Sequence, residues 1–305
     1  MKKMFLYKFM LMVCALLIAS AAILPASAVD AADKKWINQV RSQYETYNKK
    51  TVDAYKAYQE RIDKDFKQFN DSSNAVLDAL ESKVLSDQKV WIEKLEADYE
   101  QFDQLYGNNR EMADDLKRYR NYINPGTYNS PMWKYSTAAN RTHYNSTLWK
   151  LDKALNDTHF DSYMWNYRKT INPAHFDSAA WKMKNNVSDT SFDSNMWHLR
   201  KLSSDSSFDS TMWKYSKGKL SKTQAKKQYD KLFKELTTAL AKYNTARKKD
   251  ITDMANSTKK KVNELHDQTI QALESQREKT LKEISELRRK IAGEGLQWEP
   301  LLVTP

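Results

Sequence analysis

Residues 160–175 read FDSYMWNYRKTINPAH, and this 16-residue pattern occurs six times in succession. A tryptophan marks each copy, at Trp133, Trp149, Trp165, Trp181, Trp197 and Trp213. Five positions before every tryptophan is Tyr or Phe, followed by Asn or Asp and then by Ser. Met, Leu or Ala precedes the tryptophan, and Tyr, Leu or Met lies two positions after it. Self-similarity at one fixed period predicts a repeat array, in which each copy is one small structural unit.

The spacing within each copy predicts a short helix. With Asp161 as the N-cap and Ser162 as the first helical residue, Phe160 precedes the cap and Trp165 is the fourth helical residue. Side chains at those two positions pack together in a hydrophobic staple, while the carboxylate caps free backbone N–H groups. We therefore predict two-turn helices such as residues 162–170. A β-solenoid is the alternative because apolar residues alternate here, but a chain with only 5 Gly favours helices.

Long amphipathic patterns flank the repeats. Before them, apolar residues recur every three or four positions over 36–69 and 77–106, and a shorter helix is expected up to Ile123. The polar stretch 70–74 predicts a break between the first two helices, and Gly107 predicts a helix end. After the repeats, residues 221–292 contain neither Gly nor Pro and predict one long helix, with a kink or weak point near 256–261. Apolar stripes of this length need a partner, so we expect the arms to pack on each other, within one chain or in a dimer.

The predicted fold is all-α and elongated, with long coiled-coil-like helical arms flanking an array of six short 16-residue helical repeats. We divide the chain into a signal peptide (1–28), an N-terminal arm (29–124), the Trp repeats (125–218), a C-terminal arm (219–293) and a tail (294–305).

The first 28 residues have the pattern of a cleavable export signal. Lys2, Lys3 and Lys8 precede an apolar stretch over 9–24, and the cleavage motif Ala-Ser-Ala ends at Ala28. An uncleaved anchor and a lipoprotein at Cys14 are the alternatives. Cleavage would leave no cysteine and a net charge of (50 − 3) − 39 = +8. We expect a secreted bacterial protein that can associate with the cell wall, with no membrane-spanning segment after the signal is removed.

Composition and motifs give no indication of an enzyme. Five Gly and one Cys argue against nucleotide-binding folds, disulfide scaffolds and multi-cysteine zinc sites, and we find no nucleophile-elbow or HExxH motif. His143, His159 and His175 share one repeat position and suggest a zinc ladder, and the repeated aspartates suggest calcium. Polar loops and helix capping explain both sets, so we expect no catalytic residue, metal or cofactor.

The candidate ligand-binding residues are the six repeat tryptophans and the lysines that directly follow four of them. Buried tryptophans would simply form a core, whereas exposed rings would provide platforms for sugar rings. The lysines are Lys134, Lys150, Lys182 and Lys214, and they suit anionic groups. The expected partners are a cell-wall glycan or an anionic polymer, with homo-oligomerisation through the coiled coil. An export signal makes nucleic acid a poor partner.

These observations predict a secreted, non-enzymatic protein of the cell envelope that binds or scaffolds through an aromatic repeat array on a coiled-coil stalk. Two alternatives remain open. One is a purely structural or assembly protein with buried repeat tryptophans, and the other is a membrane-acting helical protein of the toxin type.

Overall fold

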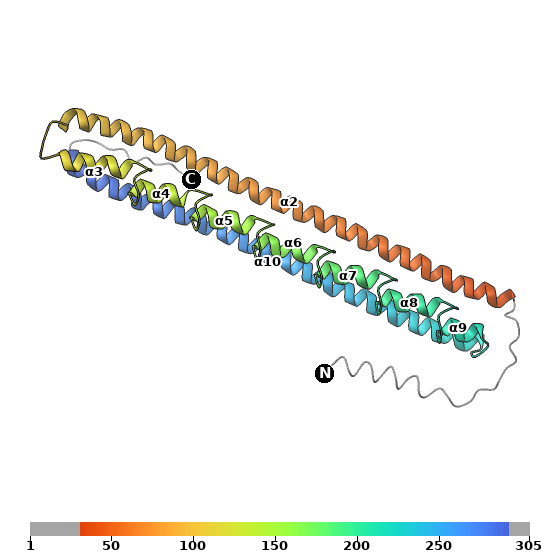
Figure 1. The fold of residues 1–305 in the computed structure, drawn as a ribbon. Coiled ribbons are helices and arrows are strands. Elements are labelled where there is room, and N and C mark those ends of the chain that lie inside the picture. Colours follow the sequence, from red (N-terminus) through yellow and green to blue (C-terminus); the bar gives the residue numbers. More distant parts are fainter. Residues whose placement is uncertain (1–30, 293–305) are drawn as a thin grey trace, which may run out of the picture. The chain divides into compact units, whose positions relative to one another are not determined.

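The structure is a computed structural model that describes residues 31–292; the predicted signal peptide and the tail lie outside this range. Every element in the described range is a helix, which confirms the all-α prediction and shows the β-solenoid alternative to be wrong for the repeats. Along the chain, the long helix α2 (Ala31–Tyr106) precedes α3 (Ala113–Ile123) and the repeat helices, and the long helix α10 (Lys222–Ala292) follows them (Figure 1). The repeat helices are α4 (Pro131–Ala138), α5 (Thr147–Leu155), α6 (Tyr163–Ile171), α7 (Ala179–Val187), α8 (Asn195–Ser203) and α9 (Thr211–Ser216).

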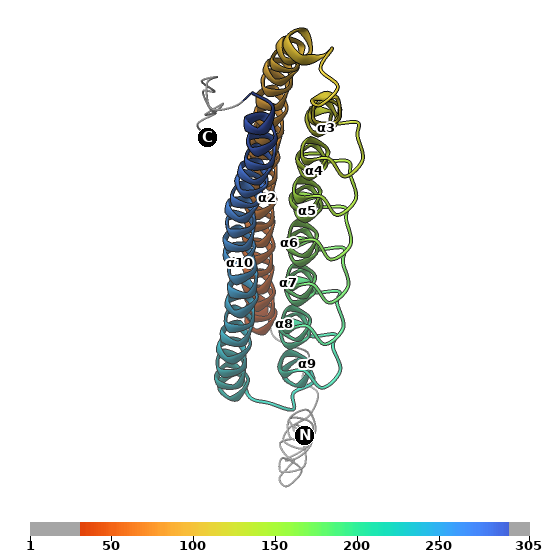
Figure 2. The ribbon, with the colours of Figure 1, turned by 90° about the vertical axis from the view of Figure 1, so that its left-hand side faces the viewer.

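The described chain divides into two compact units, and both long helices contribute to each. Unit 1 contains residues 31–60 and 173–250, with helices α7–α9; unit 2 contains residues 61–172 and 251–292, with helices α3–α6. Each unit has the same three parts, namely a segment of α2, a segment of α10 and a succession of short helices joined by loops (Figure 2). Each unit therefore contains part of both predicted arms and part of the repeat array. The arms and the repeats do not form separate units.

In unit 2, one continuous hydrophobic core joins all three parts. It contains Leu77 and Phe102 from α2, Leu148 and Met164 from repeat helices, and Ile284 from α10, together with further buried residues of the same segments. At one end of this core the Arg288 guanidinium contacts the Asp98 carboxylate through two hydrogen bonds of 2.6 and 2.9 Å. The prediction that the arms pack on each other is thus confirmed here within a single chain.

In unit 1, two smaller hydrophobic clusters join the long helices to the short ones. One joins Ile37 of α2, Met212 of α9 and Tyr229 of α10, and a second joins Tyr44 of α2 to Leu199 of α8 and to α10. The apolar stripes of both long helices are covered by short helices of the same unit, so burying them does not require a second copy of the chain.

Both long helices carry an 11-residue period that matches the 16-residue repeat. In α10 the buried residues Tyr229, Leu240, Ile251, Val262, Leu273 and Ile284 are each 11 apart. In α2, Trp36 contacts Tyr215 at 4.8 Å and Trp91 contacts Tyr135 at 5.5 Å between ring centroids, within their respective units. Tyr135 and Tyr215 are five repeats apart, and Trp36 and Trp91 are five 11-residue steps apart. Eleven residues make about three helical turns, so positions 11 apart lie on the same face of a long helix and can match a step of one repeat.

One prediction about the long helices is wrong. The polar stretch 70–74 does not interrupt α2, because Ser72 donates a hydrogen bond to the Phe69 carbonyl and Asn74 to the Asn70 carbonyl, both at 2.9 Å. These side chains bond to carbonyls of their own helix and do not cap a new one. Residues 256–261 lie inside α10, where Thr258 is buried near Met254, so the predicted kink or weak point does not end the helix. The predicted end at Gly107 and the short helix up to Ile123 agree with the ends of α2 and α3.

Candidate binding surface

The repeat helices are capped by serine, one residue later than the sequence analysis predicts. The hydroxyl oxygen of Ser162 accepts a hydrogen bond from the Trp165 backbone N–H at 2.9 Å, and its O–H donates to the Asn156 carbonyl at 2.6 Å. The serine of every repeat caps its helix in the same way. The assignment of Asp161 as N-cap is therefore wrong, and Trp165 is the third helical residue rather than the fourth.

The Asn or Asp before the cap has a different role, because it adopts the left-handed backbone conformation. Its φ lies between 61° and 64° at Asn129, Asn145, Asp161, Asp177, Asp193 and Asp209. Asn and Asp tolerate this region better than other residues with a Cβ atom, and an N-cap needs an extended backbone instead. These residues sit in a turn closed by a hydrogen bond from the serine N–H to the carbonyl three residues earlier, as from Ser162 to His159 at 3.1 Å. They take the place that glycine fills in many proteins.

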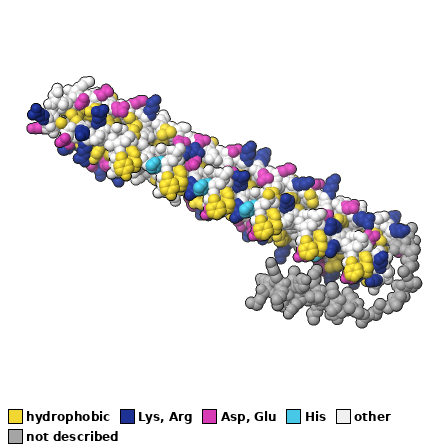
Figure 3. Space-filling view, in the orientation of Figure 1, with side chains coloured by type: hydrophobic (Ala, Val, Ile, Leu, Met, Phe, Trp, Pro, Cys, Tyr) yellow, Lys and Arg dark blue, Asp and Glu magenta, His cyan; other side chains and the backbone are white. Residues whose placement is uncertain are grey.

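The turn brings the Phe or Tyr of each repeat against its tryptophan while leaving most of its surface in solvent. The ring centroids are 4.8–5.1 Å apart in all six pairs, with interplanar angles of 56–62°. The Phe or Tyr side chains are 75–84% exposed. They are Tyr128, Tyr144, Phe160, Phe176, Phe192 and Phe208, and hydrophobic side chains form separate patches over the repeat loops in Figure 3.

The repeat tryptophans themselves are neither buried nor freely exposed; all six are partly exposed. The fully buried positions are the residue before each tryptophan and the residue two after it, as in Met164 and Tyr167 around Trp165. These neighbours point into the core, and the tryptophan lies at its edge. Its ring supports the exposed Phe or Tyr.

The lysines that follow tryptophan contact the loop carboxylates of their own repeats. The Nζ of Lys182 lies 2.9 Å from Asp177, and that of Lys214 lies 3.1 Å from Asp209. Two other repeats place Asn166 and His198 at the equivalent position, where they bond to Asp161 and Asp193. In the first two repeats the loop residue is an uncharged Asn, and Lys134 is partly exposed while Lys150 is exposed. Two of the four predicted lysines are thus already paired with an anionic group.

A second set of lysines, which sequence analysis did not single out, lies over tryptophan rings. The ammonium nitrogen is 4.9 Å from the ring centroid for Lys153 over Trp149, and 3.9 Å for Lys201 over Trp197. Lys169 over Trp165 and Lys219 over Trp213 are equivalent contacts. The signal was present in the sequence, because a lysine four positions after tryptophan in three repeats lies one helical turn away on the same face.

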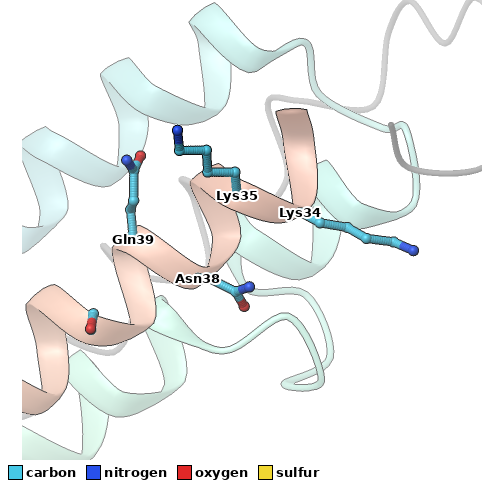
Figure 4. Close-up of a pocket in the computed structure, with 5 residues that line it drawn as sticks. Lys34, Lys35, Asn38 and Gln39 are labelled. Atoms are coloured by element: carbon cyan, nitrogen blue, oxygen red, sulfur yellow. The ribbon is translucent and has the colours of Figure 1, made fainter. Parts of the chain in front are cut away.

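Other features of the described chain do not form a comparable surface. Within residues 31–292 we find no group of three His, Cys, Asp or Glu side chains arranged to hold a metal ion. His143, His159 and His175 lie in successive repeat loops, and His143 contacts Trp133 at 6.5 Å between ring centroids. A shallow depression on the first turns of α2 is lined by polar residues such as Lys34 and Lys35, which point to different sides of the helix (Figure 4).

In comparisons with known proteins, no family model matches the chain, and no match was found among curated proteins or solved structures. Within the part of the chain that the structure describes, no helix combines the length and the apolar character that crossing a bilayer requires.

Proposed function

We propose that this chain is an exported, non-enzymatic protein of the bacterial cell envelope that binds or scaffolds a wall polymer through its repeat loops. The observation that carries the proposal is the presence of an exposed Phe or Tyr ring in every repeat, held against a tryptophan by an identical capped turn. A single exposed apolar side chain needs no explanation, but an exposed aromatic ring at the same place in all six repeats is a regular array, and this regularity supports an interaction role. The export-signal pattern of residues 1–28 supports the location outside the cytoplasm.

The partner we propose is a cell-wall glycan or an anionic wall polymer. Both are linear polymers with repeating chemistry, and a protein with repeated binding loops engages such a chain at several points, which raises the overall affinity. Lys134 and Lys150 are the two candidate lysines whose repeats carry no loop carboxylate, so they favour an anionic group in those repeats.

The test is the co-sedimentation of the purified chain, starting at residue 29, with isolated bacterial cell wall. We expect saturable binding that weakens when all six exposed rings are replaced by alanine. Cell fractionation of the expressing strain, with N-terminal sequencing of the product, tests export and cleavage after Ala28. Deleting the whole repeat array is unsuitable, because its helices supply part of the core in both units. An absence of wall binding by the intact chain would contradict the proposal.

A purely structural role is the second candidate, and the partial burial of the repeat tryptophans supports it. In that role the aromatic pairs would only stabilise the loops. Alanine at the exposed rings would then lower the free energy of unfolding without changing wall binding.

A further inference from the structure

The six exposed rings have the properties of preorganised binding groups. Each ring rests on a tryptophan, and each turn has the same backbone geometry, with a left-handed residue followed by a serine cap. A ring fixed in this way loses little conformational freedom when a ligand covers it, so less of the binding energy is lost to ordering. Aromatic side chains also offer a large contact area with few rotatable bonds.

Apart from its tryptophan, each ring has polar residues as its neighbours in the loop. In the third repeat Phe160 follows His159 and precedes Asp161, and both loop neighbours of the ring can form hydrogen bonds. The patches in Figure 3 are separated by polar and charged surface. Within each unit, neighbouring loops are one 11-residue step apart along the long helices, which corresponds to about 16 Å.

This arrangement fits a sugar better than a folded protein partner. Stable protein interfaces bury on the order of 800 Å² on each partner around a contiguous apolar centre, and isolated single rings do not form such a centre. One ring flanked by hydrogen-bonding side chains matches one pyranose, which has an apolar C–H face and a rim of hydroxyl groups. Sites for small ligands combine an apolar contact with a few placed polar groups in the same way.

The charges near the rings are mixed and do not form the continuous cationic track that an anionic polymer would need. Lysines lie over four of the six tryptophan rings, and an aspartate follows the exposed ring in the last four repeats. The cations that follow tryptophan in the fourth and sixth repeats pair with loop carboxylates, through Lys182–Asp177 and Lys214–Asp209. The exposed Asp161 carboxylate lies directly beside Phe160 and would repel a phosphate-rich chain. Hydroxyl groups, in contrast, can donate to the carboxylates and accept from neighbouring N–H groups.

We infer that the Phe and Tyr rings of the repeat loops, and not the tryptophans or the lysines after them, contact the ligand, and that this ligand is an uncharged polysaccharide with one sugar unit at each ring. The inference rests on the proposed function and specifies its partner. The tryptophan acts as a positioning residue, because it holds the ring. Several rings engage one polymer chain, so binding weakens steeply as rings are removed.

The experiment compares two cell-wall preparations, one intact and one from which acid has removed the phosphate-linked polymers. Three variants are placed in unit 2: Y128A/Y144A/F160A removes rings, K134Q/K150Q removes lysine charges, and V76A/L85A/V90A removes exposed apolar side chains of α2 as a matched control. We expect the intact chain to bind both preparations. The ring variant should lose about tenfold in affinity for both, while the other two variants keep theirs.

Folding of each variant is checked by circular dichroism and urea unfolding. If the ring variant is unstable, Tyr128→Phe and Tyr144→Phe keep the rings and should keep full binding, and soluble sugar fragments of the stripped wall should shift the tryptophan emission of the unmodified chain. Absence of both effects would overturn the inference.

The possible failures are distinguishable. Binding only to the unstripped wall, with loss in K134Q/K150Q, would overturn the sugar assignment and leave the proposed function in place. Absence of binding to either wall would reject the proposed function itself. Sedimentation also measures the oligomeric state of the ring variant. If this state changes while wall binding does not, the rings form contacts between copies of the chain, and the inference is overturned.

Discussion

At the scale of single residues, each repeat helix is capped by a serine, and in the second repeat this serine forms two hydrogen bonds. The hydroxyl oxygen of Ser146 accepts from the Trp149 N–H at 3.0 Å and its O–H donates to the Asn140 carbonyl at 2.6 Å. We expect Ser146→Ala to lower the free energy of unfolding by about 1–2 kcal/mol, because it removes the cap and leaves the carbonyl without this donor. Urea unfolding measures the change. A loss below the experimental error would show that water replaces both bonds.

The neighbouring residue provides a second test of the same turn. Asn145 has a φ of 63°. We expect Asn145→Ala to lower the free energy of unfolding by about 1 kcal/mol, since alanine lacks the short polar side chain that lets asparagine adopt the left-handed region. Asn145→Gly should change it by less than about 0.5 kcal/mol, because glycine adopts this region readily. The pair of variants separates backbone conformation from loss of the amide side chain. Equal destabilisation by both would contradict the backbone explanation.

The buried tyrosine of α3 makes stability sensitive to alkaline pH. Burial and the Asp98 carboxylate, which accepts a 2.7 Å hydrogen bond from the Tyr119 hydroxyl, raise the pKa of Tyr119 above its ordinary value. The folded state therefore holds this proton more tightly than the unfolded state. The stabilisation is fully present below the ordinary pKa of about 10 and is lost as pH rises above it.

We therefore expect the free energy of unfolding to fall with increasing pH above about 10, and to fall less steeply in Tyr119→Phe. Urea unfolding between pH 7 and pH 11 measures both slopes, and Tyr128→Phe is the matched control because Tyr128 is exposed. Identical slopes for the unmodified chain and Tyr119→Phe would assign the alkaline loss to other groups, of which Tyr44, with a pKa also raised by burial and by Asp189, is the first candidate.

At the scale of elements, the short helices depend on the long ones. Helix α5 has only nine residues, too few to be stable alone, and it buries Leu148 and Leu151 in the core of unit 2. We expect Leu148→Ala to lower the free energy of unfolding by about 2–5 kcal/mol, through lost burial and the cavity that remains. Lys150→Ala, on the exposed side of the same helix, should change it by about 0.5 kcal/mol or less. Similar losses in both would indicate that helix propensity, rather than docking, decides the stability of α5.

Elements were easier to predict from the sequence than their details. The repeat was evident because Trp165 and its equivalents recur without exception, and the ends of α2 and α3 follow from Gly107 and Pro125. The 11-residue period was overlooked because its apolar positions, such as Leu240 and Ile251, also fit the ordinary helical spacing of three and four. A second set of equivalent positions mixes residues as different as Thr280 and Ile291. The continuity of α2 through 70–74 also depends on packing, because the cap-forming residues there can equally bond back to the helix.

The candidate surface was predicted in part for the same reason. Phe160 and Trp165 were paired correctly, but periodicity does not show which ring of a pair faces solvent. The direction of each ring depends on whether Asp161 or Ser162 is the N-cap. Asp161 adopts the left-handed conformation, so the cap is Ser162, one residue later than predicted. The partners of the lysines were ambiguous because the sequence allows Lys182 to reach either a ligand or its own loop carboxylate, and only the folded structure distinguishes the two.

At the scale of the whole molecule, the matched periods predict how the chain can be shortened. One repeat corresponds to 16 residues of the array and 11 residues of each long helix, or 16 + 11 + 11 = 38 residues. In unit 2, deleting 145–160 together with 74–84 and 262–272 keeps every remaining contact in register, since Leu273 takes the place of Val262. We expect this variant to unfold cooperatively in urea, with a slope reduced in proportion to the surface it buries. Deleting 145–160 alone leaves each long helix 11 residues too long for the shortened array, so apolar residues of the long helices lose their partners. The free energy of unfolding of this variant should be much lower than that of the matched deletion. Equal stability of the two deletion variants would show that the 11-residue spacing of the long helices does not have to match the 16-residue spacing of the repeats.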